Sequence, residues 1–97
     1  MDKKENNFFN KKILIYGFGK SGSSSYKFLK KSNKISVYDD KKKGNFFSKK
    51  KTIDKINFDY IVISPGINTL KCKLKKLLKF NRRKIITDLD IFYYLKI

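Results

Sequence analysis

The chain has 97 residues, of which 40% are hydrophobic and 34% are charged, and its formal net charge at pH 7 is +17. This length suits one small domain and leaves no room for a second hydrophobic core. No apolar run approaches the ~20 residues of a membrane-spanning helix, and the charged segment 1–7 lacks the apolar stretch of a secretory signal. We therefore expect a cytoplasmic protein without membrane insertion.

The cysteine and histidine content excludes several kinds of chemistry. Cys72 is the one cysteine, and histidine is absent. An internal disulfide, a Cys/His metal centre and a triad with an imidazole base are therefore excluded. We expect Cys72 to be a small packed side chain on a helix. We also expect no catalytic residue and no metal ligand in this chain.

The strong positive charge has two explanations. A basic domain can neutralise the phosphates of a nucleic acid. However, the chain holds 23 lysines and only 2 arginines, and it lacks alanine, glutamine and tryptophan, a pattern that follows when A/T-rich codons replace G/C-rich ones. Proteins that read bases favour the bidentate fork of arginine. We therefore expect nonspecific adhesion to polyanions at low salt and no specific nucleic-acid partner.

The first predicted elements are a strand at 12–16, a glycine turn and a helix. The apolar run 13–16 leads into G-F-G-K-S-G at 17–22. In this pattern Gly17 permits a tight turn, Gly19 lets the backbone approach a phosphate, and Gly22 allows the helix to pack on the strand. Tyr26 and Leu29 continue an apolar helical face. The pattern predicts a phosphate site at the N-terminus of a helix.

The next predicted strand, at 35–38, ends at an acidic residue. Asp39 follows it, 20 residues after Gly19, where a carboxylate can reach a ribose hydroxyl or the edge of a base. A solvated, lysine-rich loop comes next. The sequence then predicts a short helix at 46–50 and a weak third strand at 52–56.

The β-branched run at 60–63 predicts a strand buried on both faces, in the centre of a parallel sheet and beside the first strand. A turn at 64–66 follows, and then a helix with apolar residues at helical spacing. A short fifth strand is predicted at 85–86, and Thr87 or Asp88 can cap a final helix. The leucines of the predicted helix after the turn are Leu70, Leu74, Leu77 and Leu78.

Strands that alternate with helices predict an α/β fold, here a Rossmann-like three-layer domain with a mostly parallel sheet of about five strands. Ligands of such domains bind at the carboxyl ends of the strands. Gly19, Asp39 and Ser64 all fall at that edge. Each also has a plainer interpretation, as a turn residue or a polar residue that ends a strand.

Four features together resemble the N-terminal domain of the Mur ligases: the glycine turn, Asp39, S-P-G-I at 64–67 and D-L-D-I-F at 88–92. The resemblance begins near Lys11, extends to the last residue and points to the D-glutamate-adding (MurD-type) branch. It implies that residues 1–97 form a single N-terminal domain. This domain would bind the UDP part of UDP-N-acetylmuramoyl-L-alanine for the ATP-dependent addition of D-glutamate in peptidoglycan biosynthesis.

The resemblance also implies a set of substrate-binding residues. Amides of the glycine turn and the hydroxyl of Ser21 would bind the diphosphate, and Asp39 and Asp40 would lie at the uracil with Lys41 beside them. Asp40 replaces the hydroxyl residue that is common in close relatives, and Asp90 replaces a glutamate. The implied residues are Gly17, Gly19, Lys20, Ser21, Gly22, Asp39, Asp40, Lys41, Ser64, Pro65 and Gly66.

The family's catalytic parts are not expected in this sequence. The resemblance assigns ATP and Mg²⁺ to a later domain, and no G-x-x-x-x-G-K-[S/T] motif occurs here. We therefore expect the ATPase and C-terminal domains to be absent, and the chain alone to be non-catalytic and without a cofactor. It would be one part of an enzyme whose remainder is separately encoded, or a truncated remnant. Two alternatives stay open: a stand-alone NAD-binding module, in which Asp39 contacts the adenosine ribose, and a basic nucleic-acid-binding domain.

Overall fold

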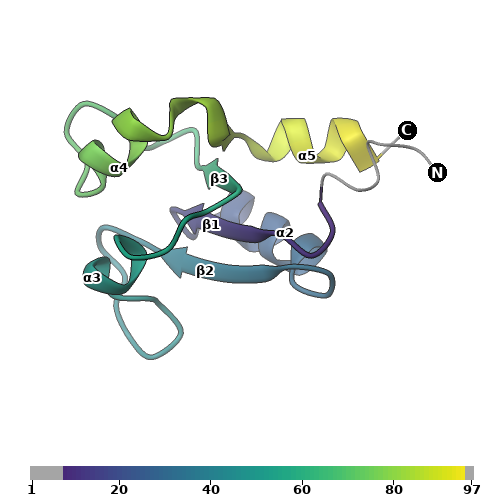
Figure 1. Ribbon diagram of the computed structural model, residues 1–97, viewed down its shortest axis with the longest axis horizontal. Helices are drawn as coiled ribbons and strands as arrows, with labels where there is room; N and C mark the ends of the chain where they lie inside the picture. The colour runs from purple at the N-terminus through teal and green to yellow at the C-terminus, as the bar shows by residue number, and fades with distance from the viewer. Residues whose placement is uncertain (1–7, 96–97) are drawn as a thin grey trace.

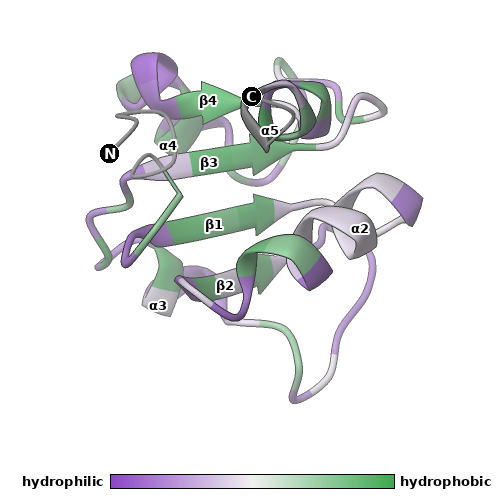
Figure 2. Ribbon diagram, turned by 90° about the vertical axis from the view of Figure 1, so that its right-hand side faces the viewer, coloured by the Kyte–Doolittle hydropathy of each residue, from purple (hydrophilic) through white to green (hydrophobic). Residues whose placement is uncertain are grey.

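The computed structural model describes residues 8–95; the expectation about segment 1–7 lies outside them. Within residues 8–95 the chain forms a four-stranded sheet in which every pair is parallel, in the order β2-β1-β3-β4. Figure 2 shows the four arrows side by side and pointing the same way. The strands are β1 (Lys12–Tyr16), β2 (Lys34–Tyr38), β3 (Tyr60–Ile63) and β4 (Ile85–Ile86).

Helices cover both faces of this sheet (Figure 1). Side chains alternate along a strand, so Ile13 and Ile15 of β1 face one side, where they pack in one cluster with residues of α2 and α5. Leu14 and Tyr16 face the other side and pack with residues of α3 and α4. This arrangement confirms the predicted three-layer α/β class. The helices are α2 (Lys20–Leu29), α3 (Lys50–Ile53), α4 (Lys75–Phe80) and α5 (Asp88–Leu95), and a 3₁₀ turn spans Arg82–Lys84.

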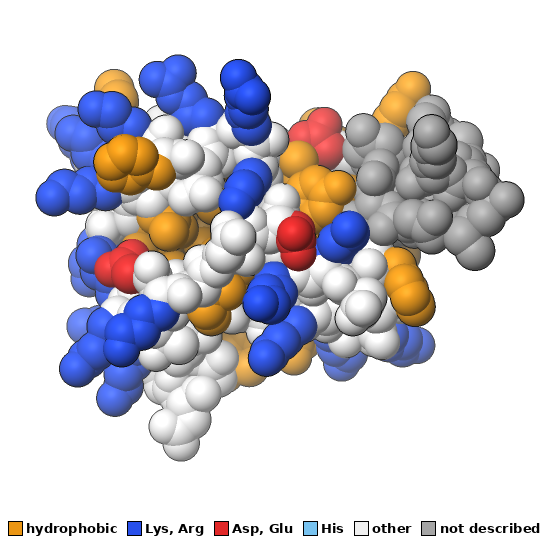
Figure 3. All heavy atoms as spheres, viewed as in Figure 1, with side chains coloured by type: hydrophobic (Ala, Val, Ile, Leu, Met, Phe, Trp, Pro, Cys, Tyr) orange, Lys and Arg blue, Asp and Glu red, His pale blue; other side chains and the backbone are white. Residues whose placement is uncertain are grey.

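The two central strands have the predicted bounds. All four apolar residues of β1 are fully buried, and Ile61 of β3 has an exposed fraction of 0%. In the register of the sheet, Leu14 of β1 lies opposite Ile61 of β3. The predicted position of β3 beside β1 is therefore confirmed. Outside this core, Lys and Arg side chains are spread over the face shown in Figure 3.

The predicted third strand at 52–56 is wrong, and the sheet has four strands instead of about five. Residues Lys50–Ile53 form the helix α3 instead. Ile53 is fully buried and Ile56 packs beside it against the same core cluster, and the N–H of Ile56 donates to the carbonyl of Ile53 at 3.2 Å. A spacing of three residues places both side chains on one side of a helical turn, whereas a strand would point them to opposite faces. The predicted helix at 46–50 is also wrong, because only Lys50 of that stretch is helical.

The leucine-rich helix is shorter than predicted. It begins at Lys75, so Leu70 lies in the turns before it and has an exposed fraction of 74%. Leu74 and Leu78 are buried, as expected. The final helix has its predicted cap: the N–H of Asp90 donates to Oγ1 of Thr87 at 3.4 Å, and the N–H of Thr87 donates to Oδ2 of Asp90 at 2.9 Å. This reciprocal pair is a capping box.

Candidate functional site

Two glycines of the turn after β1 are required by packing. Gly17 has a φ of +93°, and a Cβ there would lie 2.8 Å from Cβ of Ser64 and 2.9 Å from Cδ1 of Ile67. A Cβ on Gly22 would lie 2.1 Å from the carbonyl oxygen of Gly17. The positive φ and these side-chain contacts favour glycine at position 17, and the overlap with the backbone requires it at position 22. The helix α2 can therefore start directly against the end of β1.

Gly19 differs from both, because a Cβ at this position would meet no atom within 4 Å. It is the N-cap of α2, and no side chain caps the helix there. Among the described residues, no hydrogen bond is recorded for the N–H groups of residues 19–22. Unpaired N–H groups at a helix N-terminus, together with the helix dipole, form a binding place for an anion. Ser21 is half-buried at this end of α2, and Lys20 is exposed.

Asp39, directly after β2, fixes the glycine turn. Its Oδ2 accepts a hydrogen bond from the N–H of Phe18 at 2.8 Å, and its Oδ1 accepts from the N–H groups of Lys41 and Lys42, both at 2.9 Å. Nζ of Lys42 donates to the carbonyl of Phe18 at 2.6 Å. Partial burial raises the pKa of Asp39, but the three backbone N–H donors and the charge of Lys42 outweigh it and lower the pKa below its usual range.

Ser64, directly after β3, completes the contact between the three strand ends. Its N–H donates to the carbonyl of Tyr16 at 3.0 Å, and its Oγ donates to the carbonyl of Gly17 at 3.2 Å. Pro65 and Gly66 follow on the exposed surface. The predicted meeting of the glycine turn, Asp39 and Ser64 at one edge of the sheet is confirmed.

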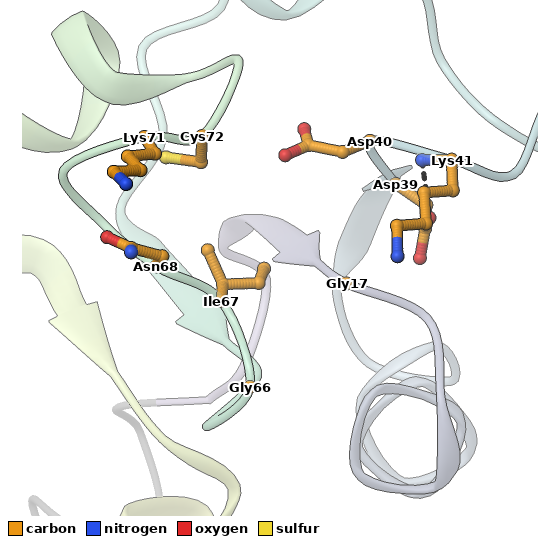
Figure 4. Close-up of a pocket in the computed structure, with 9 residues that line it drawn as sticks. All are labelled: Gly17, Asp39, Asp40, Lys41, Gly66, Ile67, Asn68, Lys71 and Cys72. Carbon is orange, nitrogen blue, oxygen red and sulfur yellow. Dashed lines mark hydrogen bonds between the residues drawn. The ribbon is translucent and has the colours of Figure 1, made fainter.

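Asp40 points away from the glycine turn. Its Oδ1 accepts a hydrogen bond from the hydroxyl of Tyr16 at 2.6 Å, and its Oδ2 accepts from the N–H of Lys73 at 3.3 Å. Figure 4 shows its carboxylate directed across the pocket towards the segment that carries Cys72. Burial and the hydrogen bond with Asp40 raise the pKa of Tyr16 far above its usual value, so Tyr16 stays a hydrogen-bond donor at neutral pH.

A pocket of about 300 Å³ lies at this edge of the sheet (Figure 4). Of the residues predicted from sequence, five line it: Gly17, Asp39, Asp40, Lys41 and Gly66. The other six predicted residues are not among its lining residues. Gly19, Lys20, Ser21 and Gly22 start α2, and Ser64 and Pro65 lie at the turn after β3.

The opposite wall of the pocket is not predicted from the sequence. Its side chains come from the segment between β3 and α4. Part of this segment has a sequence pattern that predicts a helix with its lysines exposed to solvent. Cys72, expected on a helix, instead lies in a turn and is half-buried at the pocket. The one signal for this wall is the S-P-G-I turn, which predicts an irregular path after β3. The residues that sequence reasoning missed are Ile67, Asn68, Lys71 and Cys72.

An aromatic cluster supports the glycine turn from outside. The ring of Phe18 packs against Tyr26 of α2 and against Phe46 and Phe47 of the loop after β2, with centroid distances of 6.0, 5.0 and 5.9 Å. Phe46 also contacts Tyr26 at 5.2 Å. This cluster joins the loop after β2 to the start of α2.

The D-L-D-I-F sequence has a structural role, and the described residues contain neither a metal-binding cluster nor a membrane-spanning helix. Asp90 of the D-L-D-I-F sequence belongs to the capping box of α5. Within residues 8–95 there is no group of three or more Cys, Asp or Glu side chains that could hold a metal ion. Nor does the described part of the chain contain a helix long and apolar enough to cross a membrane.

Comparison with curated proteins identifies relatives. The chain is 35% identical over 88 residues to the UDP-N-acetylmuramoylalanine–D-glutamate ligase of Oenococcus oeni. It is 36% identical to the ligases of the same name from Francisella philomiragia, over 89 residues, and Francisella tularensis, over 86 residues. These matches cover 88–89% of this chain but 20% of each relative, so the chain spans about a fifth of their length. No protein-family model matches the chain, and no solved structure matches it significantly. The chain therefore belongs to the Mur ligase family, as a domain that corresponds to the N-terminal part of the UDP-N-acetylmuramoylalanine–D-glutamate ligases.

Proposed function

We propose that this domain binds UDP-N-acetylmuramoyl-L-alanine through its UDP part, for ATP-dependent addition of D-glutamate in cytoplasmic peptidoglycan synthesis. The observation that carries the proposal is the glycine turn after β1, where Gly17 lines a pocket of about 300 Å³ and the N–H groups at the start of α2 are unpaired. Family membership supports the choice of a sugar nucleotide over other phosphate ligands.

The diphosphate would bind at the start of α2. The N–H groups of Gly19, Lys20 and Ser21 are available as donors, and the hydroxyl of Ser21 can add a further one. The helix dipole places partial positive charge at this end. Because the space beside Gly19 is open, a phosphate can approach the backbone there without meeting a side chain.

The uracil and ribose would lie in the pocket beside Asp39 and Lys41. Three of the about four acceptor positions of the Asp39 carboxylate are used by backbone N–H groups, which leaves one on Oδ2 for a donor such as uracil N3–H. Lys41 lines the same side of the pocket. Gly66 would contact the nucleotide from the turn after β3, which also holds Ser64 and Pro65.

We assign ATP and Mg²⁺ to parts of the ligase outside this domain. No phosphate-binding loop of the G-x-x-x-x-G-K-[S/T] type is present in the sequence, and the described residues lack a metal-binding cluster. We propose that both are bound by other parts of the ligase, in the same polypeptide or in a separately encoded chain. The role of this domain is then to hold and orient the sugar nucleotide.

Calorimetric titration of the chain at physiological salt tests this function. UDP-N-acetylmuramoyl-L-alanine and UDP should bind saturably, whereas NAD and single-stranded RNA should not. Preference for NAD would support the dinucleotide alternative, and preference for RNA at this salt would assign the positive charge to nucleic-acid binding. Absence of UDP binding by a folded chain would contradict the proposal.

A further inference from the structure

The wall of the pocket opposite Asp39 is a segment without regular structure. Residues 64–74, the β3–α4 segment, contribute five of the residues that line the pocket. Its internal hydrogen bonds are local: Ile67 N–H to the carbonyl of Ser64, Lys71 N–H to the carbonyl of Asn68, and Leu70 N–H to Oδ1 of Asn68. Such turns do not define where the segment lies relative to the sheet, so contacts with other elements must do so.

Two side chains at the carboxyl ends of β1 and β2 provide these contacts. The hydroxyl of Tyr16 accepts a hydrogen bond from the N–H of Leu74 at 3.3 Å and donates to Oδ1 of Asp40 at 2.6 Å. Oδ2 of Asp40 accepts from the N–H of Lys73 at 3.3 Å. Two consecutive amides at the end of the segment are thereby bound to one Tyr–Asp pair. Leu74 and Tyr16 are 58 residues apart in the sequence, and Lys73 and Asp40 are 33 residues apart.

The surroundings make this pair a fixed anchor. Tyr16 is fully buried, so its hydroxyl is shielded from water, and its 2.6 Å hydrogen bond to Oδ1 of Asp40 is short. The ring of Tyr16 packs against Tyr38 with a centroid distance of 5.8 Å. Leu74, the next residue after the anchored Lys73, is buried in the same core cluster.

We infer that Asp40 and Tyr16 are positioning residues, which hold the β3–α4 segment as the second wall of the pocket and thereby set its affinity for the sugar nucleotide. The inference rests on the proposed function for its ligand. It assigns Asp40 a role different from the contact with uracil that family resemblance implies. Figure 4 supports this difference, since the carboxylate is directed across the pocket and away from Gly17.

The test uses the whole chain, three variants of the pair and a matched control for each. Tyr16→Phe removes the hydroxyl and keeps the ring. Asp40→Ala removes both acceptors, whereas Asp40→Asn keeps one oxygen that can accept from Tyr16. Tyr38→Phe is the control for the first change, because within residues 8–95 no hydrogen bond is recorded for its hydroxyl. Asp59→Asn and Asp59→Ala are the controls for the two substitutions of Asp40, because the carboxylate of Asp59 accepts a hydrogen bond from the N–H of Lys12 at the opposite end of β1.

Two readouts separate the possible outcomes. Amide hydrogen exchange should become faster at residues 66–74 in Tyr16→Phe and Asp40→Ala but not in β1 or β3, and Asp40→Asn should restore part of the protection. UDP affinity should fall about tenfold in Tyr16→Phe and Asp40→Ala, which is about 1.4 kcal/mol of binding free energy. A double variant with Tyr16→Phe and Asp40→Ala should bind UDP no more weakly than either single variant, because the two residues act as one unit. The controls should change neither quantity.

Other results would overturn the inference. If Asp40→Ala weakens UDP binding while Tyr16→Phe does not, and exchange at 66–74 stays unchanged, Asp40 contacts the ligand directly. If exchange rises throughout the sheet, the pair stabilises the whole domain instead of one wall. If the wild-type chain does not bind UDP, the proposed function and the claim about affinity both fail. Hydrogen exchange then decides by itself whether the pair anchors the segment.

Discussion

The carboxylate of Asp39 accepts a hydrogen bond from the backbone N–H of Phe18 at 2.8 Å, although the two residues lie 21 positions apart in the sequence. With the bond from Nζ of Lys42 to the carbonyl of Phe18, it fixes both polar groups of the residue between Gly17 and Gly19. The end of β2 thus determines the shape of the turn that follows β1.

Asp39→Asn should lower the free energy of unfolding by about 1–2 kcal/mol at pH 7, since hydrogen bonds to an ionised acceptor are lost. The pKa of Asp39 is lower in the folded state than in the unfolded state. The ionised carboxylate therefore contributes to the free energy of unfolding above the unfolded-state pKa. This contribution disappears as the pH falls through the lower folded-state pKa. The difference between variant and wild type should therefore shrink below about pH 4. Urea unfolding at several pH values measures it.

Asp54→Asn is the matched control for that experiment. Asp54 forms a salt bridge with Lys50 at 3.1 Å, and both side chains are about half exposed. Its replacement should change the free energy of unfolding by less than about 0.5 kcal/mol. Equal effects of the two substitutions at pH 7 would contradict a special role for Asp39.

Gly22→Ala should destabilise the domain by about 3 kcal/mol, the upper end of the range for overpacking, because its Cβ would overlap the carbonyl of Gly17. Gly66→Ala is the control, since a Cβ there meets no atom within 4 Å. Thermal unfolding followed by circular dichroism compares the two. A Gly22→Ala variant as stable as wild type would show that α2 does not lie this close to β1.

Gly19→Val should leave the melting temperature within a few degrees of wild type, because a Cβ at Gly19 meets no atom within 4 Å, and it should abolish detectable UDP binding. The branched side chain would occupy the approach of the phosphate to the backbone. Paired thermal and calorimetric measurements check both parts. A folded variant with unchanged affinity would remove the glycine turn from the proposed site.

Phe18→Ala should release the loop after β2 from the start of α2. It deletes the ring that contacts Tyr26, Phe46 and Phe47, and we expect a loss of about 2 kcal/mol, below the 3–5 kcal/mol of a fully buried phenylalanine. Limited proteolysis should then cut at 42–49 sooner than in wild type. Phe80→Ala, at an 84% exposed side chain, should leave the cleavage rate unchanged.

The parts of the fold that could be predicted from sequence are those with strong local patterns. The continuous apolar runs of β1 and β3 are typical of strands in the middle of a parallel sheet, and the glycine spacing predicts where α2 begins. The edge at which Gly17, Asp39 and Ser64 meet then follows from the parallel topology. These predictions depend on residues that are close together in the chain.

The errors fall where distant residues determine the local structure. A helical pattern starting at Leu70 is present, but the amides of Lys73 and Leu74 are bound by Asp40 and Tyr16, and α4 begins only after them. No local pattern contains that information. The short α3 is easily mistaken for a strand because its four residues carry one buried side chain, Ile53, which is too little to reveal a period.

The three glycines of the turn would respond differently to random mutagenesis. In a library selected only for a folded domain, positions 17 and 22 should return glycine almost exclusively, because their Cβ atoms would collide with the backbone or with Ser64. Position 19 should accept many residue types under the same selection. Glycine would be recovered there only when the selection demands capture of a nucleotide, so the residue at position 19 reports on ligand binding independently of folding.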